Sequence, residues 1–311
     1  MIYTLLLNPA VDVIFEMDEL VAGATVTGLP SRIMPAGKGL NAARAARFLG
    51  APTTMVAVLP EQSRNMFAEA ASAFDILTHV IEVPGRARTN VTVLESTGRV
   101  SHLNALSAPV PEDTEFEVLS LISSLAFFGD VWILVGSVPP GISPSIYRQI
   151  ITVLKHAGCA VILDTSGEAL HQGFSAAPTM LMPNRAELGS LFGLSCADEA
   201  SVIHAADEVL DQGLSSVLIT LGRDGAYAAR ASERFFVRIP KIDAVDTVGC
   251  GDAAAAGMAV GLHRNLDFKD RCRLATAAAM SAALHKGPGI LAQDDVIAFI
   301  ERIVFEDVRQ R

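Results

Sequence analysis

The sequence has little of what marks a secreted, zinc-binding or membrane-spanning chain. It holds four cysteines in 311 residues, none in CxxC spacing, which gives neither a disulfide framework nor a zinc site. No apolar run approaches the roughly 20 residues that a membrane helix needs. The N-terminal apolar run lacks a basic leader and stops at Asn8-Pro9, as in a first β-strand and unlike a signal peptide. We therefore expect a reduced, cytoplasmic protein without a membrane segment.

Charge is also scarce. Only 19% of the residues are charged, and 24 basic residues against 34 acidic ones give a net charge of −10. The lack of a Lys/Arg cluster argues against nucleic-acid binding. A local site can still be basic on an acidic surface, so an anionic small-molecule substrate is compatible with this balance. Half of the residues are apolar, which indicates a folded chain with a substantial core.

Short apolar runs alternate along the chain with longer amphipathic segments. The strand candidates are residues 2–7, 53–59, 131–137, 160–166, 179–184 and 216–222. The helix candidates are residues 39–49, 61–73, 113–127, 144–157, 185–192, 198–212, 251–263, 267–285 and 293–305. Near-continuous apolar strands alternating with helices predict a doubly wound α/β sandwich with a mostly parallel sheet. We expect one domain over residues 1–311.

Two segments interrupt the alternation. Residues 10–34 and 86–106 are rich in Val and Thr, are punctuated by turns and lack helical periodicity. The second resembles a hairpin that turns at Ser96-Thr97-Gly98. Together they predict a small β-sheet that projects from the sandwich as a lid, with an ordinary antiparallel edge extension as the alternative.

The stretch Asp246–Gly257, DTVGCGDAAAAG, joins a glycine-rich turn to a helix-forming run. Gly249 and Gly251 allow positive φ and close approach. A glycine turn at a helix start directs free N–H groups and the positive end of the helix dipole at one spot, which suits an anion. Asp252 would repel that anion unless it receives a proton from an incoming hydroxyl. We therefore predict Asp252 as a general base beside a hole for a phosphoryl group, with a plain N-cap as the alternative.

Polar residues also follow the first predicted strand and open the first helix. Asp12 is either a turn former or an acceptor for a substrate hydroxyl. In AGKGLN, Gly37 permits close backbone approach, Lys38 adds a cation and Asn41 offers an amide to a polyol. An ordinary glycine turn before a helix fits that segment as well. The P-loop pattern GxxxxGKS/T is not matched, so this is not a Walker nucleotide site.

Two further clusters follow later strands. Asn184 and Glu187 have the spacing of a capping box, or alternatively place a carboxylate where it could hold a magnesium–water shell near phosphates. The segment Thr220–Gly225, TLGRDG, is a second glycine loop directly after a strand.

These stretches together resemble the PfkB carbohydrate kinases, a ribokinase-like family. DTVGCGD is similar to the D-T-x-G-A-G-D signature, with Cys250 where Ala is usual, and AGKGLN resembles G-G-K-G-x-N, with Ala36 in place of the first Gly. NRAE matches N-x-x-E. Within the family, MIYTLLLNPAVD, RTNVTV, GSVPPGI and ILDTSGEAL resemble the branch that contains 1-phosphofructokinases and tagatose-6-phosphate kinases.

The resemblance implies a three-layer α/β/α sandwich with a β lid, ATP as phosphoryl donor, Mg²⁺, and a phosphorylated ketohexose as acceptor. Asp252 would be the base, and Gly249, Cys250 and Gly251 would supply the anion-hole amides. The residues implied to hold the sugar or its phosphate are Asp12, Gly37, Lys38, Asn41, Arg88, Asn90 and Ser137. Those implied for ATP are Asn184, Thr220, Gly222 and Gly225, and Glu187 would serve the metal through water. Relatives often dimerise through the lid, so a homodimer is expected.

Two departures leave the acceptor open. Relatives that act on phosphosugars carry a basic residue on the first lid strand, where this sequence has Val26-Thr27, and the expected E-L-N becomes His102-Leu103-Asn104. A missing Arg removes a charge-assisted phosphate contact. A kinase of an unphosphorylated sugar or polyol is the second hypothesis, and a catalytically silent sugar or nucleotide sensor is the third.

Overall fold

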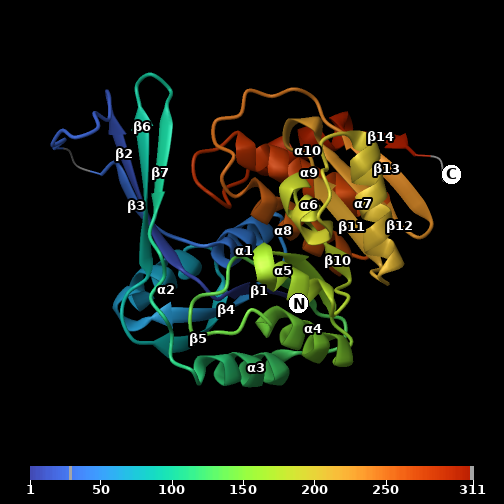
Figure 1. The fold of residues 1–311 in the computed structure, drawn as a ribbon, viewed down its shortest axis with the longest axis horizontal. Coiled ribbons are helices and arrows are strands. Elements are labelled where there is room, and N and C mark those ends of the chain that lie inside the picture. Colours follow the sequence, from blue (N-terminus) through green and yellow to red (C-terminus); the bar gives the residue numbers. More distant parts are fainter. Residues whose placement is uncertain (28–29, 309–311) are drawn as a thin grey trace.

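Most strands of the protein form one large sheet. In the computed structural model, which describes residues 1–27 and 30–308, these strands are β1 (Ile2–Leu6), β4 (Thr53–Pro60), β5 (Leu77–Val83), β8 (Val131–Val135), β9 (Ala160–Asp164), β10 (Met180–Leu181), β11 (Ser216–Thr220), β12 (Ala226–Arg230), β13 (Glu233–Arg238) and β14 (Val304–Asp307). Their order is β14-β13-β12-β11-β10-β9-β8-β1-β4-β5 (Figure 1). The strands from β5 to β11 are parallel, and β12 to β14 add an antiparallel edge.

Helices cover both faces of the large sheet. One face carries α3 (Thr114–Leu125), α4 (Ile146–His156), α5 (Gly167–Phe174), α6 (Arg185–Phe192) and α7 (Glu199–Asp211). The other carries α1 (Lys38–Phe48), α8 (Cys250–His263), α9 (Phe268–Ala283) and α10 (Gln293–Arg302). A 3₁₀ turn, η1 (Glu61–Ser63), leads into α2 (Arg64–Ser72), which packs on β4. Alternate residues of β8 divide between the two cores: Trp132 enters one and Ile133 the other. The predicted three-layer α/β/α sandwich with a mostly parallel sheet is confirmed.

A second, small sheet stands away from the sandwich (Figure 1). It consists of β2 (Ala10–Met17), β3 (Arg32–Ala36), β6 (Arg88–Glu95) and β7 (Val100–Asn104), in the order β3-β2-β6-β7. These strands come from the two segments in which a small sheet was expected, of which residues 28–29 lie outside the described chain. Gly98, with φ of 85°, lies in the turn between β6 and β7, as predicted.

The strand register gives the small sheet two unlike faces. One face, called here the polar face, carries the row Met34, Asp12, Asn90, Asn104 and the row Arg32, Ile14, Thr92, His102. The opposite, apolar face carries the row Ile33, Val13, Val91, Leu103. Val11, on the apolar face, packs against the core between α1 and α2. The polar face is therefore turned away from α1 and α2.

Several elements differ from the sequence-based prediction. β5, β12 to β14 and α5 were not predicted, and the helix expected over 293–305 ends at Arg302. Residues 304–307 instead pair with β13, and Phe305 packs edge-on against Phe235 with ring centroids 5.0 Å apart. The alanine-rich β12 has weak intrinsic strand propensity. Pairing with β11 and β13, together with the contact between Tyr227 and Phe236, holds it in the sheet.

Candidate active site

Three neighbouring parallel strands end at one edge of the large sheet, and each ends in or is followed by a polar residue. Asn8 follows β1, Ser137 follows β8 and Asp164 is the last residue of β9. In the sheet, β4 is the neighbour of β1 on one side, and β8 followed by β9 lies on the other side. In open α/β sheets, ligands bind where the strand order reverses in this way.

Helix α8 begins at this edge after a sharp turn at Gly249. Gly249 is the N-cap residue with φ of 83°, and a Cβ there would lie 2.7 Å from Cβ of Pro288, so glycine is required. Gly251 does not share this conformation: it lies within α8, and a Cβ there would be 3.8 Å from Asp164 Oδ2. Asp252 is the third residue of the helix, so the alternative of a plain N-cap is wrong.

The first amides of α8 are available to a ligand. Cys250 N makes one long backbone bond, 3.4 Å to Thr247 O, and within residues 1–27 and 30–308 the amides of Gly251 and Asp252 have no hydrogen-bond partner. Burial, with the charges of Asp246 and Asp252, raises the pKa of the Cys250 thiol to about 11, so it stays neutral. Free N–H donors at the positive end of a helix dipole suit a phosphoryl group.

Asp252 is buried but lies among polar groups. The residue is 3% exposed, and Asn41 Nδ2 donates a 2.8 Å hydrogen bond to its Oδ2. Burial raises the pKa of the carboxyl to about 6; the charge of Lys38 and the Asn41 hydrogen bond oppose this rise, and the charge of Asp164 adds to it. A carboxylate with this pKa is ionised at neutral pH and is more basic than an ordinary aspartate, which suits proton abstraction.

Asp164 belongs to this cluster although the sequence motifs did not single it out. Lys38 Nζ lies 3.2 Å from Asp164 Oδ1 and 3.4 Å from Oδ2. Burial lowers the pKa of Lys38, but the carboxylates of Asp164 and Asp252 raise it more, so the pKa is above its ordinary value and Lys38 stays charged. The position of Asp164 at the carboxyl end of a predicted strand was the available signal.

The start of α1 is held by close backbone contacts. Gly37, its N-cap residue, has φ of 139°, and a Cβ there would lie 2.5 Å from Leu6 Cδ1. Gly289 packs so closely against Asn41 that a Cβ would lie 2.6 Å from the Asn41 carbonyl oxygen. The side-chain oxygen of Asn41 is buried and has no hydrogen-bond partner in the described residues. Asn41 is thus fixed in place with an acceptor left for a ligand hydroxyl.

A second polar group lies on the small sheet. Asn90 Nδ2 donates a 2.9 Å hydrogen bond to Asp12 Oδ1 across β2 and β6. Burial raises the pKa of the Asp12 carboxyl above its ordinary value. The Asn90 hydrogen bond and the charges of Arg88 and His102 oppose this rise but do not cancel it. Arg88 makes a weak 3.5 Å bond to the Ala105 carbonyl oxygen, and its buried Nε has no partner in the described chain. The structure therefore brings Asp12, Asn90 and Arg88 together on the polar face.

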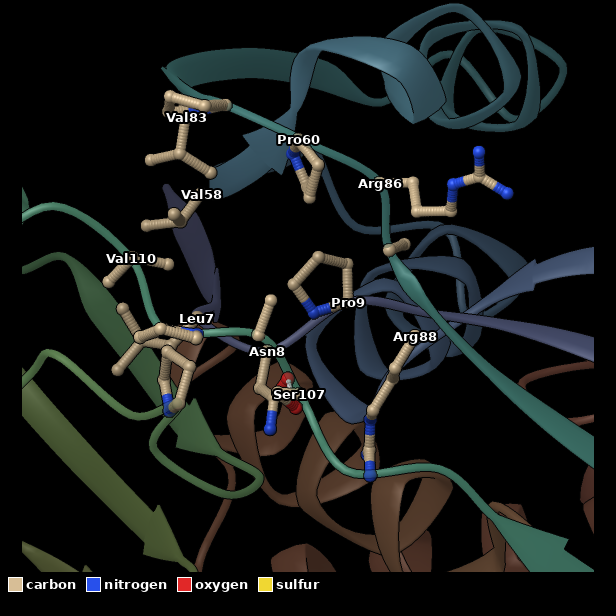
Figure 2. Close-up of a pocket in the computed structure, with 15 residues that line it drawn as sticks. Leu7, Asn8, Pro9, Val58, Pro60, Val83, Arg86, Arg88, Ser107 and Val110 are labelled. Atoms are coloured by element: carbon tan, nitrogen blue, oxygen red, sulfur yellow. Dashed lines mark hydrogen bonds between the residues drawn. The ribbon is translucent and has the colours of Figure 1, made fainter.

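Ser137 lies in a third polar group, at the base of the small sheet. Asn8 Nδ2 donates to Ser137 Oγ at 2.9 Å, and Ser107 Oγ donates to Asn8 Oδ1 at 2.7 Å. Asn8 and Ser107 border a small cavity of about 30 Å³ that Arg86 and Arg88 also line. Figure 2 shows Arg88 extending toward the segment after β7, whereas Arg86 points away.

The residues predicted for ATP and metal gather after β10 and β11. Asn184 and Thr220 form an isolated parallel bridge, and Gly222 and Gly225 have positive φ in the turn after β11. Asn184 and Glu187 form a capping box: Asn184 Oδ1 accepts from the Glu187 amide, and Glu187 Oε2 accepts from the Asn184 amide, both at 2.9 Å. The capping alternative is confirmed, and it leaves one Glu187 oxygen without a capping role.

The sequence and fold match one family of enzymes. The profile described as pfkB family carbohydrate kinase matches residues 9–295. The chain belongs to this family and is a carbohydrate kinase. Within it, the 1-phosphofructokinase of Escherichia coli (strain K12) is 33% identical over 301 residues, 96% of each chain, and that of Rhodobacter capsulatus is 32% identical over 289 residues, 92% of each. Phosphofructokinase-2 from Escherichia coli, solved with potassium, aligns with a TM-score of 0.91 at 25% identity, covering 96% of this chain and 98% of that one.

Proposed function

We propose that the protein is an ATP-dependent kinase that phosphorylates a hydroxyl of a phosphorylated ketohexose, with an acceptor like that of a 1-phosphofructokinase. One observation carries the proposal: a buried carboxylate with a pKa raised to about 6, Asp252, lies in the same helical turn as the free amides at the start of α8. A base for the hydroxyl and a hole for the phosphoryl group are thus adjacent.

Each group of the site has a role in this reaction. Asp252 accepts the proton of the attacking hydroxyl. The amides of Gly249, Cys250 and Gly251 stabilise the charge on the transferring group, and Lys38 adds a positive charge at the same place. Gly37, Asn41, Asp12 and Asn90 hold the sugar. Because the site mixes a buried base with free donors, excluding bulk water strengthens each of these interactions.

Asn184, Thr220, Gly222 and Gly225 are proposed to bind ATP. The residues near them also fit Mg²⁺. No group of three or more His, Cys, Asp or Glu is placed to hold a metal in the described chain, but Mg²⁺ keeps several waters and needs only one or two carboxylates. Asp164 and the free oxygen of Glu187 are the two candidates, and the charge of each acts on the Lys38 ammonium. When bound, Mg²⁺ would offset charge on the ATP phosphates.

The identity of the acceptor rests on Arg88 and Ser137. Arg88 has a buried Nε without a partner in the described residues, and Ser137 lies at the base of the same sheet. An arginine whose N–H groups are unsatisfied suits a phosphate or another oxyanion. The two 1-phosphofructokinases named above support the same class of acceptor.

A substrate panel tests the proposal directly. Fructose 1-phosphate, fructose 6-phosphate and tagatose 6-phosphate are compared with the free sugars, by ATP consumption. We expect one phosphorylated ketohexose to give a kcat/KM roughly 10- to 100-fold above its free sugar, as a charge-assisted contact would. Preference for a free sugar would support the second hypothesis, and turnover of any sugar excludes the silent sensor.

The catalytic assignment needs a separate variant. Asp252→Asn should lower kcat by roughly 10²- to 10⁴-fold while substrate binding is retained. Asp243→Asn is the matched control, because Asp243 is exposed in the loop before α8 and makes no side-chain bond in the described chain. Near-native turnover by Asp252→Asn would refute the proposal that Asp252 is the general base.

We further propose that residues 1–311 act as one kinase domain whose small sheet closes over the sugar as a lid. A second copy of the chain would cover the apolar face of this sheet, since Ile33 and Leu103 are each 57% exposed at the two ends of its apolar row. A four-stranded sheet with one bare apolar face is marginal by itself. A tetrameric inhibited form is known for phosphofructokinase-2 from Escherichia coli.

A cytoplasmic location is part of the same proposal. Within the described chain no helix is long and apolar enough to span a bilayer.

A further inference from the structure

Two hydroxyl groups hold one backbone carbonyl just beyond the end of β8. Tyr147, on α4, donates from its hydroxyl to the Gly136 carbonyl oxygen at 2.9 Å, and the same hydroxyl lies 3.0 Å from the Val135 carbonyl oxygen. Thr165, directly after β9, donates from Oγ1 to the same Gly136 oxygen at 2.8 Å. Tyr147 is fully buried and Thr165 is 2% exposed, so both donors are shielded from water.

These bonds fix the direction of the peptide that joins Gly136 to Ser137. Gly136 N donates to the Asp164 carbonyl oxygen at 3.1 Å, so the N–H and the C=O of Gly136 both point toward the end of β9. In a trans peptide, the C=O of one residue and the N–H of the next point in opposite directions, and the described chain contains no cis peptide. The Ser137 N–H is therefore directed away from β9, to the side of β8 on which β1 lies.

On that side the Ser137 N–H is available to a ligand. It has no hydrogen-bond partner among residues 1–27 and 30–308, and Ser137 is exposed. Asn8 Nδ2 donates to Ser137 Oγ at 2.9 Å, which leaves the hydroxyl hydrogen free to donate in turn. The strand order reverses between β1 and β8, which is where ligands of open α/β sheets bind. Ser137 thus offers an N–H and an O–H at this place.

Tyr147 is suited to a permanent structural bond at this peptide. Burial, with the charge of Asp164, raises the pKa of the Tyr147 hydroxyl above its ordinary value. The hydroxyl therefore keeps its proton and remains a donor at neutral pH.

We propose that Tyr147 is a positioning residue for the sugar phosphate: with Thr165, it holds the Gly136–Ser137 peptide so that the Ser137 N–H donates to a phosphate oxygen. The inference rests on the proposed function, in which the acceptor is phosphorylated. It adds a backbone donor, and the buried residue that aims it, to the side-chain contacts of Arg88 and Ser137. A backbone N–H that donates to a phosphate makes a charge-assisted bond, which weakens steeply when the N–H is misdirected.

Steady-state kinetics of variants that lose one hydroxyl test the assignment. Tyr147→Phe should raise the KM for the preferred phosphorylated ketohexose roughly 10-fold, and Thr165→Val roughly 5-fold, because each variant loses a bond that fixes the peptide. Thr165→Ser, which keeps the hydroxyl, should retain a KM close to that of wild type. The kcat, the KM for ATP and the turnover of free fructose should not change, since Gly136 N keeps its bond to Asp164.

Tyr227→Phe is the matched control. Tyr227 is also fully buried in the core on this face of the large sheet, but its hydroxyl has no hydrogen-bond partner within the described residues. Its removal should leave all the kinetic constants unchanged. Thermal unfolding shows which variants are folded, and the pair Thr165→Val and Thr165→Ser decides the question if Tyr147→Phe does not fold.

The outcomes separate this inference from the proposed function. If the wild-type enzyme prefers a phosphorylated ketohexose and folded Tyr147→Phe keeps its KM, the role of Tyr147 is refuted and the proposed function stands. The same conclusion follows if Thr165→Val keeps its KM. An equal rise in KM for free and phosphorylated sugars, or a loss confined to kcat, also refutes the positioning role. If the wild-type enzyme uses only free sugars, both the proposed function and the inference are wrong.

Discussion

Replacing Asp252 with asparagine should stabilise the folded protein while it removes catalysis. The folded state binds the carboxyl proton more tightly than the unfolded state, because burial raises the pKa from 3.8 to about 6. Ionising this group above about pH 6 therefore costs folding free energy. The shift of roughly two pKa units corresponds to about 3 kcal/mol at 1.36 kcal/mol per unit.

The sign of the pH dependence follows from proton binding. Between about pH 4 and 6 the folded wild-type protein binds more protons than the unfolded chain, so this group makes wild-type stability fall as pH rises. The asparagine side chain of the variant does not titrate. The stability of Asp252→Asn relative to wild type should therefore increase across this range, and should level off above about pH 7.

Urea denaturation followed by circular dichroism at a series of pH values measures this difference. Asp243→Asn, on an exposed side chain, should show little pH-dependent difference from wild type. A difference between Asp252→Asn and wild type that stays flat from about pH 4 to 8 would refute the argument that burial sets the basicity of Asp252. Retained sugar binding by the variant, measured by calorimetry, checks that the site is still formed.

Three further substitutions probe separate parts of the molecule. Arg88→Ala should raise the KM for the phosphorylated sugar roughly 10- to 100-fold with little effect on free sugars; an equal effect on both would show that Arg88 does not bind phosphate. Gly249→Ala should destabilise the protein by roughly 1–3 kcal/mol in urea denaturation and lower kcat, because φ is positive and the new Cβ would meet Pro288; unchanged stability would contradict the required turn. Ile33→Glu should convert the dimer to a monomer in light-scattering measurements, whereas Val21→Glu, on an exposed residue outside the small sheet, should leave the dimer intact; a monomeric wild type would exclude the proposed interface.

The parallel centre of the fold could be predicted because its strands are covered on both faces. β1, β8 and β9 are near-continuous apolar runs, which is the pattern that burial on two faces requires. The antiparallel edge gave no such signal. β12 is alanine-rich, and β14 forms only because β13 presents an open edge far away in sequence. Such strands depend on tertiary pairing more than on local propensity.

The site could be predicted where a residue type has a defined role in local backbone structure, such as a glycine in the turn before a helix. Gly249 has positive φ at a helix start, as predicted, and Gly37 makes the predicted close backbone approach, whereas Gly251 lies within the helix without positive φ. Asp164 had no motif of its own, because its role depends on the 3.2 Å approach of Lys38 from a distant helix. The two segments of the small sheet could be located from their composition, but only the register showed that His102 shares a face with Asp12.

The close packing of Pro288 and Gly289 against Gly249 and Asn41 has a consequence for how activity is acquired. The start of the helix that carries Asp252, the proposed general base, and Asn41, which bonds that carboxylate, both pack against a loop near the end of the sequence. During synthesis this loop leaves the ribosome after every other part of the catalytic centre. A nascent or truncated chain that lacks it could bury much of its core and still be unable to transfer phosphate, so enzymatic activity reports on completed folding more strictly than compactness does.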